Sequence, residues 1–170
     1  MLKLYRTNNE QVHEKLKSLL PADSEIKRTE NGKPYTDGAC FSITHTGDTA
    51  LIAISDCPIG IDAEILQKRK FSSVLKNFSS REQSEIGENN IEFLKHWVVK
   101  EAYIKLIGGT LAHDLKRLEY HGGQLYYNGI KANCNILCTC LDNLIYCVCA
   151  QSDIPENLKT EIIYRYARAV

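Results

Sequence analysis

The chain has 170 residues, with 21 basic and 21 acidic side chains. A chain of this length buries roughly 70% of its unfolded surface, which favours one compact domain or two small fused lobes. The balanced charge argues against a nucleic-acid partner bound by bulk electrostatics, so local clusters must carry any phosphate recognition. Residues 1–10 lack the apolar core of a signal peptide, and no stretch approaches the roughly 20 apolar residues of a membrane span. We therefore expect a cytoplasmic protein that does not bind a membrane.

Apolar periodicity and turn residues predict helices alternating with short strands. Val12, Leu16 and Leu19 recur at helical spacing, and Ser79 with Glu82 has the spacing of a capping box that opens a helix. The expected elements are, in chain order, a helix over 11–20, strands over 41–46, 51–55 and 59–65, a helix from 79 or 80, a helix over 91–107, strands over 118–120, 125–127, 130–141 and 144–150, and a last strand over 161–168. This order argues for an α+β fold with antiparallel sheets rather than a βαβ repeat.

Five of the seven cysteines lie between residues 134 and 149, in a segment that alternates like β-structure. If residues 142–143 form a two-residue turn, Cys138 falls opposite Cys147 on the neighbouring strand. Reduced thiols that serve as small core side chains are the plainer interpretation, because free cysteine is among the most buried residue types. A Zn²⁺ site is the alternative, although the usual C-x-x-C ligand spacing is absent.

Two acidic clusters carry the strongest chemical signal in the chain. On an extended segment Asp62 and Glu64 point to one face with Cα atoms roughly 6.5 Å apart, so both carboxylates can reach one ion. Further along, Glu101 and Lys105 lie at i and i+4 on one face of the expected helix. Mg²⁺ prefers a few carboxylates together with water and phosphate oxygens. Taken singly, Asp62 with Glu64 is more often a solvated strand face, and Glu101 with Lys105 is more often a surface ion pair.

Four motifs in a fixed order make a more specific pattern. They are Gly32-Lys33-Pro34-Tyr35, Phe41-Ser42-Ile43-Thr44-His45-Thr46, Gly60-x-Asp62-x-Glu64 and Trp97-x-x-Lys100-Glu101-Ala102-x-x-Lys105. Together they resemble the signature of the 4′-phosphopantetheinyl transferases, in the W/KEA branch of the surfactin-synthetase-activating type. The resemblance runs from about Gly32 to the end of the chain.

The resemblance implies a holo-[acyl-carrier-protein] synthase. Such an enzyme transfers the 4′-phosphopantetheine arm from coenzyme A to a serine of an apo acyl or peptidyl carrier protein and releases adenosine 3′,5′-bisphosphate. The implied fold has two pseudo-symmetric lobes, each a helix packed on a small antiparallel sheet, with the active site between them. Here the lobes would span residues 1–60 and 61–170, and a fused pair of lobes favours a monomer.

The resemblance also implies a role for each matching residue. Asp62, Glu64 and Glu101 would hold Mg²⁺, for which Mn²⁺ is a substitute, and Glu101 would also act as general base. Trp97 would be a packing anchor for the helix. The expected cofactor contacts are Lys100 and Lys105 to the phosphates, Thr44 and His45 to the pyrophosphate, and Gly32, Lys33 and Pro34 on the adenine side.

The segment before Gly32 is shorter than the family norm and leaves the 3′-phosphate without an obvious partner. We expect the carrier protein to dock near Phe78 and Leu111. Two rival interpretations stay open at this point. One is a Zn²⁺-binding or interaction module built on the clustered cysteines, and the other is a different Mg²⁺-dependent phosphotransfer enzyme.

Overall fold

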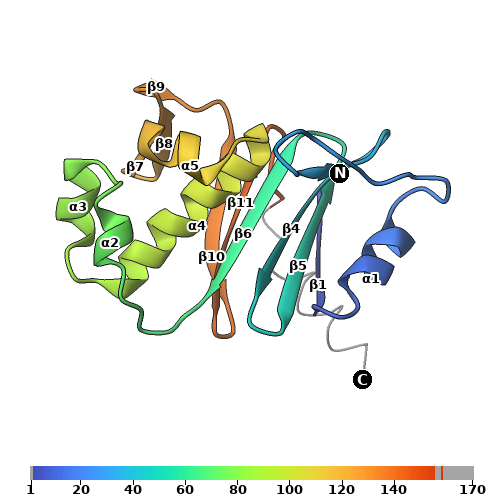
Figure 1. Cartoon of the computed structure of the whole chain (residues 1–170), viewed down its shortest axis with the longest axis horizontal. Helices are drawn as coiled ribbons and strands as arrows, with labels where there is room; N and C mark the ends of the chain where they lie inside the picture. The colour runs from blue at the N-terminus through green and yellow to red at the C-terminus, as the bar shows by residue number, and fades with distance from the viewer. Residues whose placement is uncertain (1, 156–157, 159–170) are drawn as a thin grey trace.

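The computed structural model describes residues 2–155 and 158, and its first sheet comes from the N-terminal part of the chain. This antiparallel sheet has the order β1 (Lys3–Asn8), β5 (Thr49–Ser55) and β4 (Cys40–Thr46). Helix α1 (Val12–Leu19) covers its outer face through an apolar cluster around Tyr5, Leu16 and Ile52. Figure 1 shows α1 at one end of the molecule, beside β1 and β5.

The second sheet has the order β10 (Asn135–Leu141), β11 (Leu144–Ala150) and β6 (Ile59–Ile65), again antiparallel. Helix α4 (Asn90–Ile107) packs on the face of this sheet that points away from the first one (Figure 1). All seven residues of β11 are buried. Its side chains alternate between α4 on one side and the first sheet on the other.

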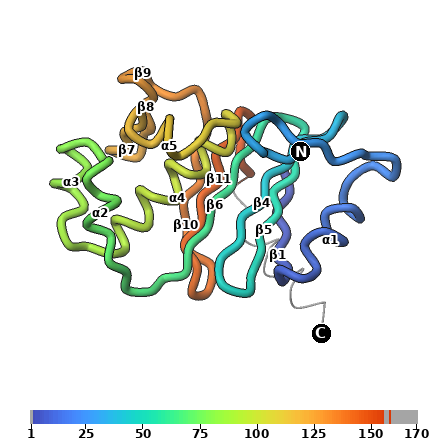
Figure 2. Tube along the Cα trace, viewed as in Figure 1, coloured from blue at the N-terminus to red at the C-terminus, as the bar shows by residue number. Residues whose placement is uncertain are grey.

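An apolar core joins the two sheets. Leu4 and Leu51 from the first sheet meet Ile61 and Val148 from the second in one buried cluster. The order of layers is therefore α1, first sheet, second sheet and α4, and Figure 2 shows β6 between β4 and β11 in this arrangement. The centre of the molecule lies at the junction between β4 and β6.

Side-chain hydroxyls, rather than backbone carbonyls, connect β4 to β6. Ser42 Oγ accepts a hydrogen bond from Ile61 N at 3.1 Å. Thr44 Oγ1 accepts from Ala63 N at 3.3 Å, and Thr46 Oγ1 accepts from Ile65 N at 3.2 Å. Because alternate residues of a strand share a face, residues 42, 44 and 46 of β4 form a row that satisfies every second N–H of β6. We call Ser42, Thr44 and Thr46 the hydroxyl row.

Gly60 allows α4 to lie close to β6. A Cβ atom at Gly60 would lie 1.9 Å from the carbonyl oxygen of Ala102 and 2.5 Å from the nitrogen of Leu106. Both atoms belong to the helix backbone, so a side chain here would push α4 away from the strand. The glycine thus sets the distance between Asp62 on β6 and the helix residues that face it.

The remaining elements surround these layers. Helices α2 (Ser72–Leu75) and α3 (Ser80–Ile86) lie beside the first turns of α4. A separate antiparallel sheet, β7 (Leu118–His121), β8 (Gln124–Tyr127) and β9 (Ile130–Lys131), contacts α4 through β7. The connections hold α5 (Leu111–Asp114), the 3₁₀ turn η1 (Leu115–Arg117) and the short pair β2 (Lys27–Arg28) and β3 (Pro34–Tyr35). Among the described residues, no helix combines the length and apolar character needed to cross a membrane.

The α+β class with small antiparallel sheets is confirmed. The predicted bounds of β6 and β11 match the structure, and Ser79 forms the expected capping box with Glu82. The expected strand over 130–141 is two strands, because β9 pairs with β8 whereas β10 pairs with β11, and the chain crosses between the sheets at 132–134. The expected strand over 161–168 lies outside the described residues.

The sequence analysis missed β1. Its adjacent residues Leu4 and Tyr5 are both buried, one against the second sheet and one against α1, so an apolar–polar alternation is absent. The division into lobes at residues 60 and 61 stays a prediction. In the structure β6, which contains this point, bonds by backbone to β11 and by the hydroxyl row to β4.

The hydroxyl row can be tested by removing one hydroxyl at constant shape. We expect Thr46→Val to lower the free energy of unfolding by about 1 to 2 kcal/mol, because Ile65 N then loses its acceptor in a part-buried position. Thr46→Ser keeps the hydroxyl and is the matched control. Urea unfolding of the three proteins measures the difference, and equal stability of the valine and serine variants would contradict the role given to the row.

Candidate active site

Asp62 is a buried carboxylate at the junction of the two sheets. Its side chain is 6% exposed, and Oδ1 accepts hydrogen bonds from Lys105 Nζ at 2.7 Å and from Thr44 Oγ1 at 2.9 Å. The second oxygen, Oδ2, is buried and has no hydrogen-bond partner among the described residues. Burial raises the pKa of Asp62, while Lys105 opposes this shift. Asp62 is therefore part of the interior, and the solvated strand face considered from the sequence is wrong for it.

Glu64 lies two residues further along β6 on the same side of the strand. Arg69 Nη2 lies 2.8 Å from its Oε2, and Trp97 Nε1 donates to its Oε1 at 3.2 Å. Trp97 also stacks with Phe93, with ring centroids 6.2 Å apart. Trp97 thus packs against Phe93 of its own helix, in line with the expected packing role. Its indole N–H also orients the Glu64 carboxylate, a contact that the sequence analysis missed.

Glu101 faces these two acids from α4. Burial, together with the charges of Asp62 and Glu64, raises the pKa of Glu101 to about 7 against the opposing effect of Lys105. The three carboxylates are thus close enough to disfavour each other's charge, and Lys105 offsets only part of the repulsion. Glu101 and Lys105 do not form the surface ion pair considered from the sequence, because Lys105 is directed to Asp62.

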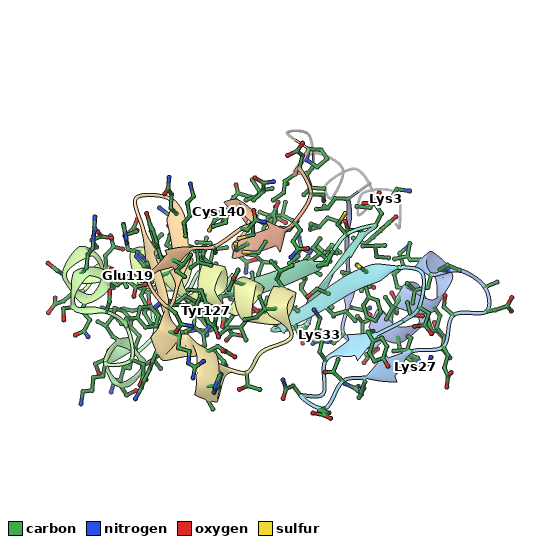
Figure 3. All side chains as sticks on the ribbon, turned by 90° about the horizontal axis from the view of Figure 1, so that it is seen from above. Lys3, Lys27, Lys33, Glu119, Tyr127 and Cys140 are labelled. Carbon is green, nitrogen blue, oxygen red and sulfur yellow. The ribbon has the colours of Figure 1, made fainter. Side chains whose placement is uncertain are left out.

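A cleft of about 240 Å³ opens beside this acidic cluster. Gly32, Lys33 and Pro34 line one side, and Lys105 lines the other together with the loop at 108–109. The structure therefore brings the Gly-Lys-Pro motif to the end of α4, from a position more than 60 residues earlier in the chain. Lys33 Nζ donates to the carbonyl of Leu106 at 3.2 Å, and burial lowers the pKa of Lys33. Figure 3 shows Lys33 at this end of the helix.

Thr44 and His45 lie on opposite faces of β4, so they meet different surroundings. The Thr44 hydroxyl is buried and is shared between Asp62 and Ala63 N. His45 is exposed, and its Nδ1 lies 2.9 Å from Asn9 Oδ1. Neither residue lines the cleft. Their contact with a pyrophosphate stays a prediction.

Lys100 lies in the core and not in the cleft. Its side chain is 0% exposed, and its Nζ donates to Glu82 Oε2 at 2.8 Å and to the carbonyl of Leu118 at 2.7 Å. The ammonium also lies 3.9 Å from the centre of the Phe78 ring, and burial lowers the pKa of Lys100. A cation held in this way cannot reach a phosphate in the cleft. The predicted contact between Lys100 and the phosphates is therefore wrong, and the residue belongs to the core.

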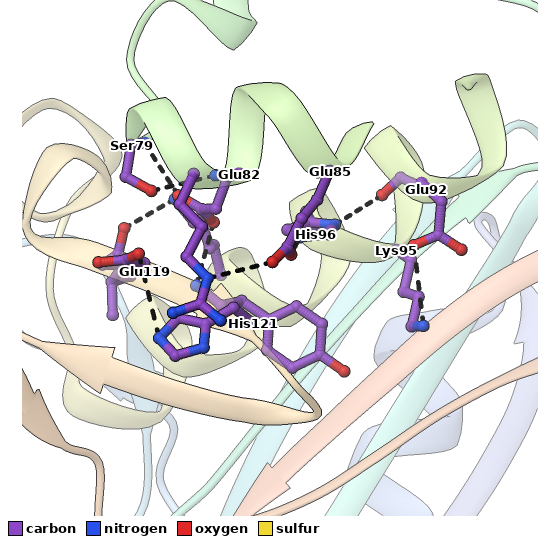
Figure 4. A network of polar contacts seen from close by, with 12 residues as sticks. Ser79, Glu82, Glu85, Glu92, Lys95, His96, Glu119 and His121 are labelled. Atoms are coloured by element: carbon purple, nitrogen blue, oxygen red, sulfur yellow. Dashed lines mark hydrogen bonds and ion pairs between the residues drawn. The ribbon is translucent and has the colours of Figure 1, made fainter. Parts of the chain in front are cut away.

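Glu82 is the partner that fixes Lys100, and it connects three elements. It closes the capping box of α3 by accepting from Ser79 N, and its Oε1 accepts from Tyr120 N of β7 at 3.0 Å. Figure 4 shows Ser79 and Glu82 in this network, between α3 and the strand that carries Glu119 and His121. Phe78 is 4% exposed under the network, so only Leu111 of the expected carrier-docking pair reaches the surface.

Two residues that support the site were not singled out from the sequence. Arg69, the partner of Glu64, stands in the basic run 68–70, which was the available signal. Asp114 holds the loop beside the cleft, since its carboxylate accepts from Thr110 N at 2.8 Å and from the Tyr127 hydroxyl at 2.7 Å. A Cβ at Gly109 would lie 2.2 Å from Asp114 Oδ2, so a side chain there would displace this carboxylate.

The described part of the chain contains no ready-made cluster of three or more His, Cys, Asp or Glu side chains arranged to hold a metal ion. Lys105 and Thr44 occupy Oδ1 of Asp62, and Trp97 and Arg69 occupy the two oxygens of Glu64. Asp62 Oδ2 is the oxygen of these two acids that has no hydrogen-bond partner among the described residues.

Comparison with known proteins agrees with this geometry. A family model described as the 4′-phosphopantetheinyl transferase superfamily matches residues 58–134, which include Asp62, Glu64, Glu101 and Lys105. The match spans 77 of the 170 residues, and the likeness is to this stretch of the chain. Of the four motifs, the match covers the third and the fourth.

Individual relatives are also named as phosphopantetheinyl transferases. The 4′-phosphopantetheinyl transferase psf-1 of Bacillus pumilus is 32% identical over 105 residues, which are 56% of this chain and 45% of the relative. The 4′-phosphopantetheinyl transferase gsp of Aneurinibacillus migulanus is 33% identical over 89 residues, 49% and 38% of the two chains. The L-aminoadipate-semialdehyde dehydrogenase-phosphopantetheinyl transferase of Xenopus laevis is 29% identical over 117 residues, 56% and 39%. The chain therefore spans less than half the length of these curated relatives.

The place of Lys100 in the core predicts a stability effect. We expect Lys100→Met to lower the free energy of unfolding by about 3 to 5 kcal/mol, because Glu82 is left as a buried charge without its cation. Adding Glu82→Gln removes that charge and should recover part of the loss. Thermal and urea unfolding of the single and double variants measure this. A methionine variant as stable as the wild type would restore Lys100 as a candidate phosphate ligand.

The raised pKa of Glu101 predicts a pH-dependent cost. Below its ordinary value of 4.5 the carboxyl is protonated in both states and costs nothing. As the pH rises from 4.5 to about 7, the unfolded chain ionises first, so Glu101 progressively destabilises the fold, by at most about 3 kcal/mol above pH 7. Glu101→Gln removes this cost.

Urea unfolding at pH 5 and pH 8, with a chelator present, tests the prediction. We expect Glu101→Gln to gain stability relative to the wild type at pH 8 more than at pH 5. Glu88→Gln, at an exposed position, is the control and should change neither value. An equal effect of Glu101→Gln at both pH values would contradict the assigned environment of Glu101.

Proposed function

We propose that the chain transfers the 4′-phosphopantetheine arm of coenzyme A to a serine hydroxyl of an apo acyl or peptidyl carrier protein. The observation that carries this proposal is Lys105, which lines the cleft together with the Gly-Lys-Pro motif and binds Asp62 of the acidic cluster at 2.7 Å. The superfamily match over 58–134 and the names of the relatives support the same reaction class.

The acidic cluster has the donor chemistry of a Mg²⁺ site, in which Mn²⁺ is a substitute. Asp62 Oδ2 is a buried oxygen without a hydrogen-bond partner among the described residues, and burial together with the neighbouring charges of Asp62 and Glu64 raises the pKa of Glu101. Both features are relieved by a divalent cation held by Asp62, Glu64 and Glu101. The ion would supply charge neutralisation for the pyrophosphate.

Glu101 is the proposed general base. It faces the interior of the site from α4, and its pKa near 7 allows it to accept a proton at neutral pH. The serine oxygen of the carrier forms a bond to the β-phosphorus, and its proton passes to a Glu101 oxygen. The bond from this phosphorus to the bridging oxygen breaks, and adenosine 3′,5′-bisphosphate leaves with that oxygen.

Lys105 is the proposed phosphate ligand. In the structure its ammonium is bound to Asp62 Oδ1, yet its side chain remains 29% exposed and lines the cleft. When Asp62 turns to a cation, Lys105 is free to pair with the departing phosphate and offset its charge. Gly32, Lys33 and Pro34 then form the wall against which the adenine end lies. The Thr44 hydroxyl orients Asp62 in this scheme, and the contact of His45 with the pyrophosphate is retained as part of the proposal.

Mass spectrometry of the carrier protein tests the function. An apo carrier incubated with the protein, coenzyme A and Mg²⁺ should gain the phosphopantetheine mass. Glu101→Gln should slow this gain by a factor of about 10² or more, because the base is lost. The exposed variant Glu88→Gln should react like the wild type.

Two results would contradict the proposal. If no carrier from a panel of acyl, polyketide and peptidyl types gains mass with the wild type, the transfer itself is refuted. If Glu101→Gln transfers at the wild-type rate, the reaction stands and the role of Glu101 falls.

A further inference from the structure

Four cysteines place their sulfur atoms in a continuous row beneath α4. We call Cys134, Cys138, Cys147 and Cys149 the sulfur row. The thiols of Cys147 and Cys149 lie 3.9 Å apart and are fully buried, and Cys134 and Cys138 pack against the same apolar core. Neither the proposed transfer nor the superfamily match gives these thiols a role.

The strand register puts one pair of the sulfur row directly face to face. Cys138 of β10 is opposite Cys147 of β11, as the sequence predicted from the turn at 142–143. Leu141 and Leu144 flank that two-residue turn and form the closing, hydrogen-bonded pair of the hairpin. Hydrogen-bonded and non-hydrogen-bonded pairs alternate along an antiparallel ladder, so the Cys138 and Cys147 pair is of the non-hydrogen-bonded kind.

Pairs of that kind have the spacing that a disulfide needs. Their Cα atoms lie about 4.5 Å apart, with the side chains close together, and disulfides form at Cα separations of about 4.4 to 6.8 Å. The other cysteines are less well placed for a disulfide across the ladder. Cys149 is opposite Ile136, and Cys134 precedes β10, so neither of them has a cysteine directly across the ladder.

The two thiols of the pair differ in access and charge. Cys138 is only part-buried and lies on the edge strand of its sheet, whereas Cys147 is fully buried. The hydrogen bond with Cys147 and the positive charge of Lys95 on α4 lower the pKa of Cys138. A partly exposed thiol beside a cation is the more reactive of the two, because the thiolate is the nucleophile.

We propose that Cys138 and Cys147 are an oxidation site that closes to a reversible intramolecular disulfide when the protein meets a peroxide. The Cys138 thiolate attacks one peroxide oxygen, the O–O bond breaks, and Cys138 becomes a sulfenic acid while the other oxygen leaves as water. The Cys147 thiol then attacks the Cys138 sulfur, the S–O bond breaks and a second water leaves. Two hydrogens are lost from the protein and the peroxide is reduced. A thiol reductant reverses the reaction.

The site adjoins the acidic cluster through the strand ladder. Cys147 pairs with Asp62 of β6, and Cys149 directs its thiol to the carbonyl of Val99 on α4 at 3.8 Å. A disulfide to Cys138 would turn the Cys147 sulfur toward β10 and away from the Cys149 thiol. The inference does not depend on the proposed transferase activity, because its readout is the covalent state of two thiols.

The test treats the reduced native protein with hydrogen peroxide, unfolds it in denaturant that contains N-ethylmaleimide so that every remaining thiol is blocked, and measures the intact mass. We expect one disulfide per chain, seen as two thiols withheld from the blocking reagent and restored by dithiothreitol. Trypsin leaves the cysteines of 134–149 on one peptide, because no lysine or arginine lies between them. Chymotrypsin, which cleaves after Leu141 and Tyr146, separates Cys138 from Cys147 and identifies the bridge.

Three variants make the result specific. Cys138→Ala and Cys147→Ala should each abolish the bridge, and Cys147→Ala should accumulate a sulfenic acid at Cys138 that dimedone traps. Cys140→Ala, at the exposed neighbour on the same strand, should still form it. Circular dichroism checks that each variant is folded, and the wild-type linkage map decides the matter if Cys147→Ala is not.

Three outcomes would overturn the inference. Oxidation that stops at Cys140 while Cys138 and Cys147 remain blocked by the reagent shows that the pair is inert. A bridge between any other two cysteines shows that the register does not select the pair. A bridge that still forms in Cys138→Ala also shows that the register does not select the pair.

Discussion

The fold depends on the hydroxyl row that joins β4 to β6. A strand in the middle of a protein needs a hydrogen-bond acceptor for each N–H on both edges, and β6 obtains them by backbone on the side of β11 only. On the other side Ser42, Thr44 and Thr46 supply oxygens at the period of the strand. The connection by side chains lets two separate sheets share one core. Thr44 Oγ1 also donates its proton to Asp62. The same hydroxyl therefore connects β4 to β6 and binds the buried carboxylate.

The electrostatics of the site follow from this joint and from Gly60. The hydroxyl row positions Asp62 and Glu64 on the side of β6 that faces α4, and Gly60 lets the helix approach until Ala102 lies against the strand. Glu101 and Lys105 are thereby brought to the same small volume. Three acids with one close lysine, Lys105, and one more exposed cation, Arg69 on Glu64, leave an imbalance that raises the pKa of Glu101. Tight packing of the backbone thus creates the charge density that suits a cation and a pyrophosphate.

The two lysines of α4 show how helix geometry divides one motif between two tasks. Lys100 and Lys105 are five residues apart, which turns them by about 140° around the helix axis. Trp97, Glu101 and Lys105 follow at intervals of four and share the face over β6, where they meet Glu64 and Asp62. Lys100 is directed instead toward α3 and β7, where Glu82 and the Leu118 carbonyl take up its charge. One lysine stabilises the position of the helix, and the other faces the cleft.

The sequence by itself determined the α+β class, most strand and helix bounds, the Cys138–Cys147 register and the acidic residues of the candidate site. These are local properties, because periods of two and 3.6 residues, turn signals and motif spacing are written in short segments. Only the tertiary structure decided that Lys100 is buried, that Lys105 binds Asp62, that Trp97 and Arg69 hold Glu64, and that Gly32 to Pro34 share a cleft with Lys105. Each of these depends on which elements meet across the core, and a contact between segments far apart in the chain leaves no periodic trace in either of them.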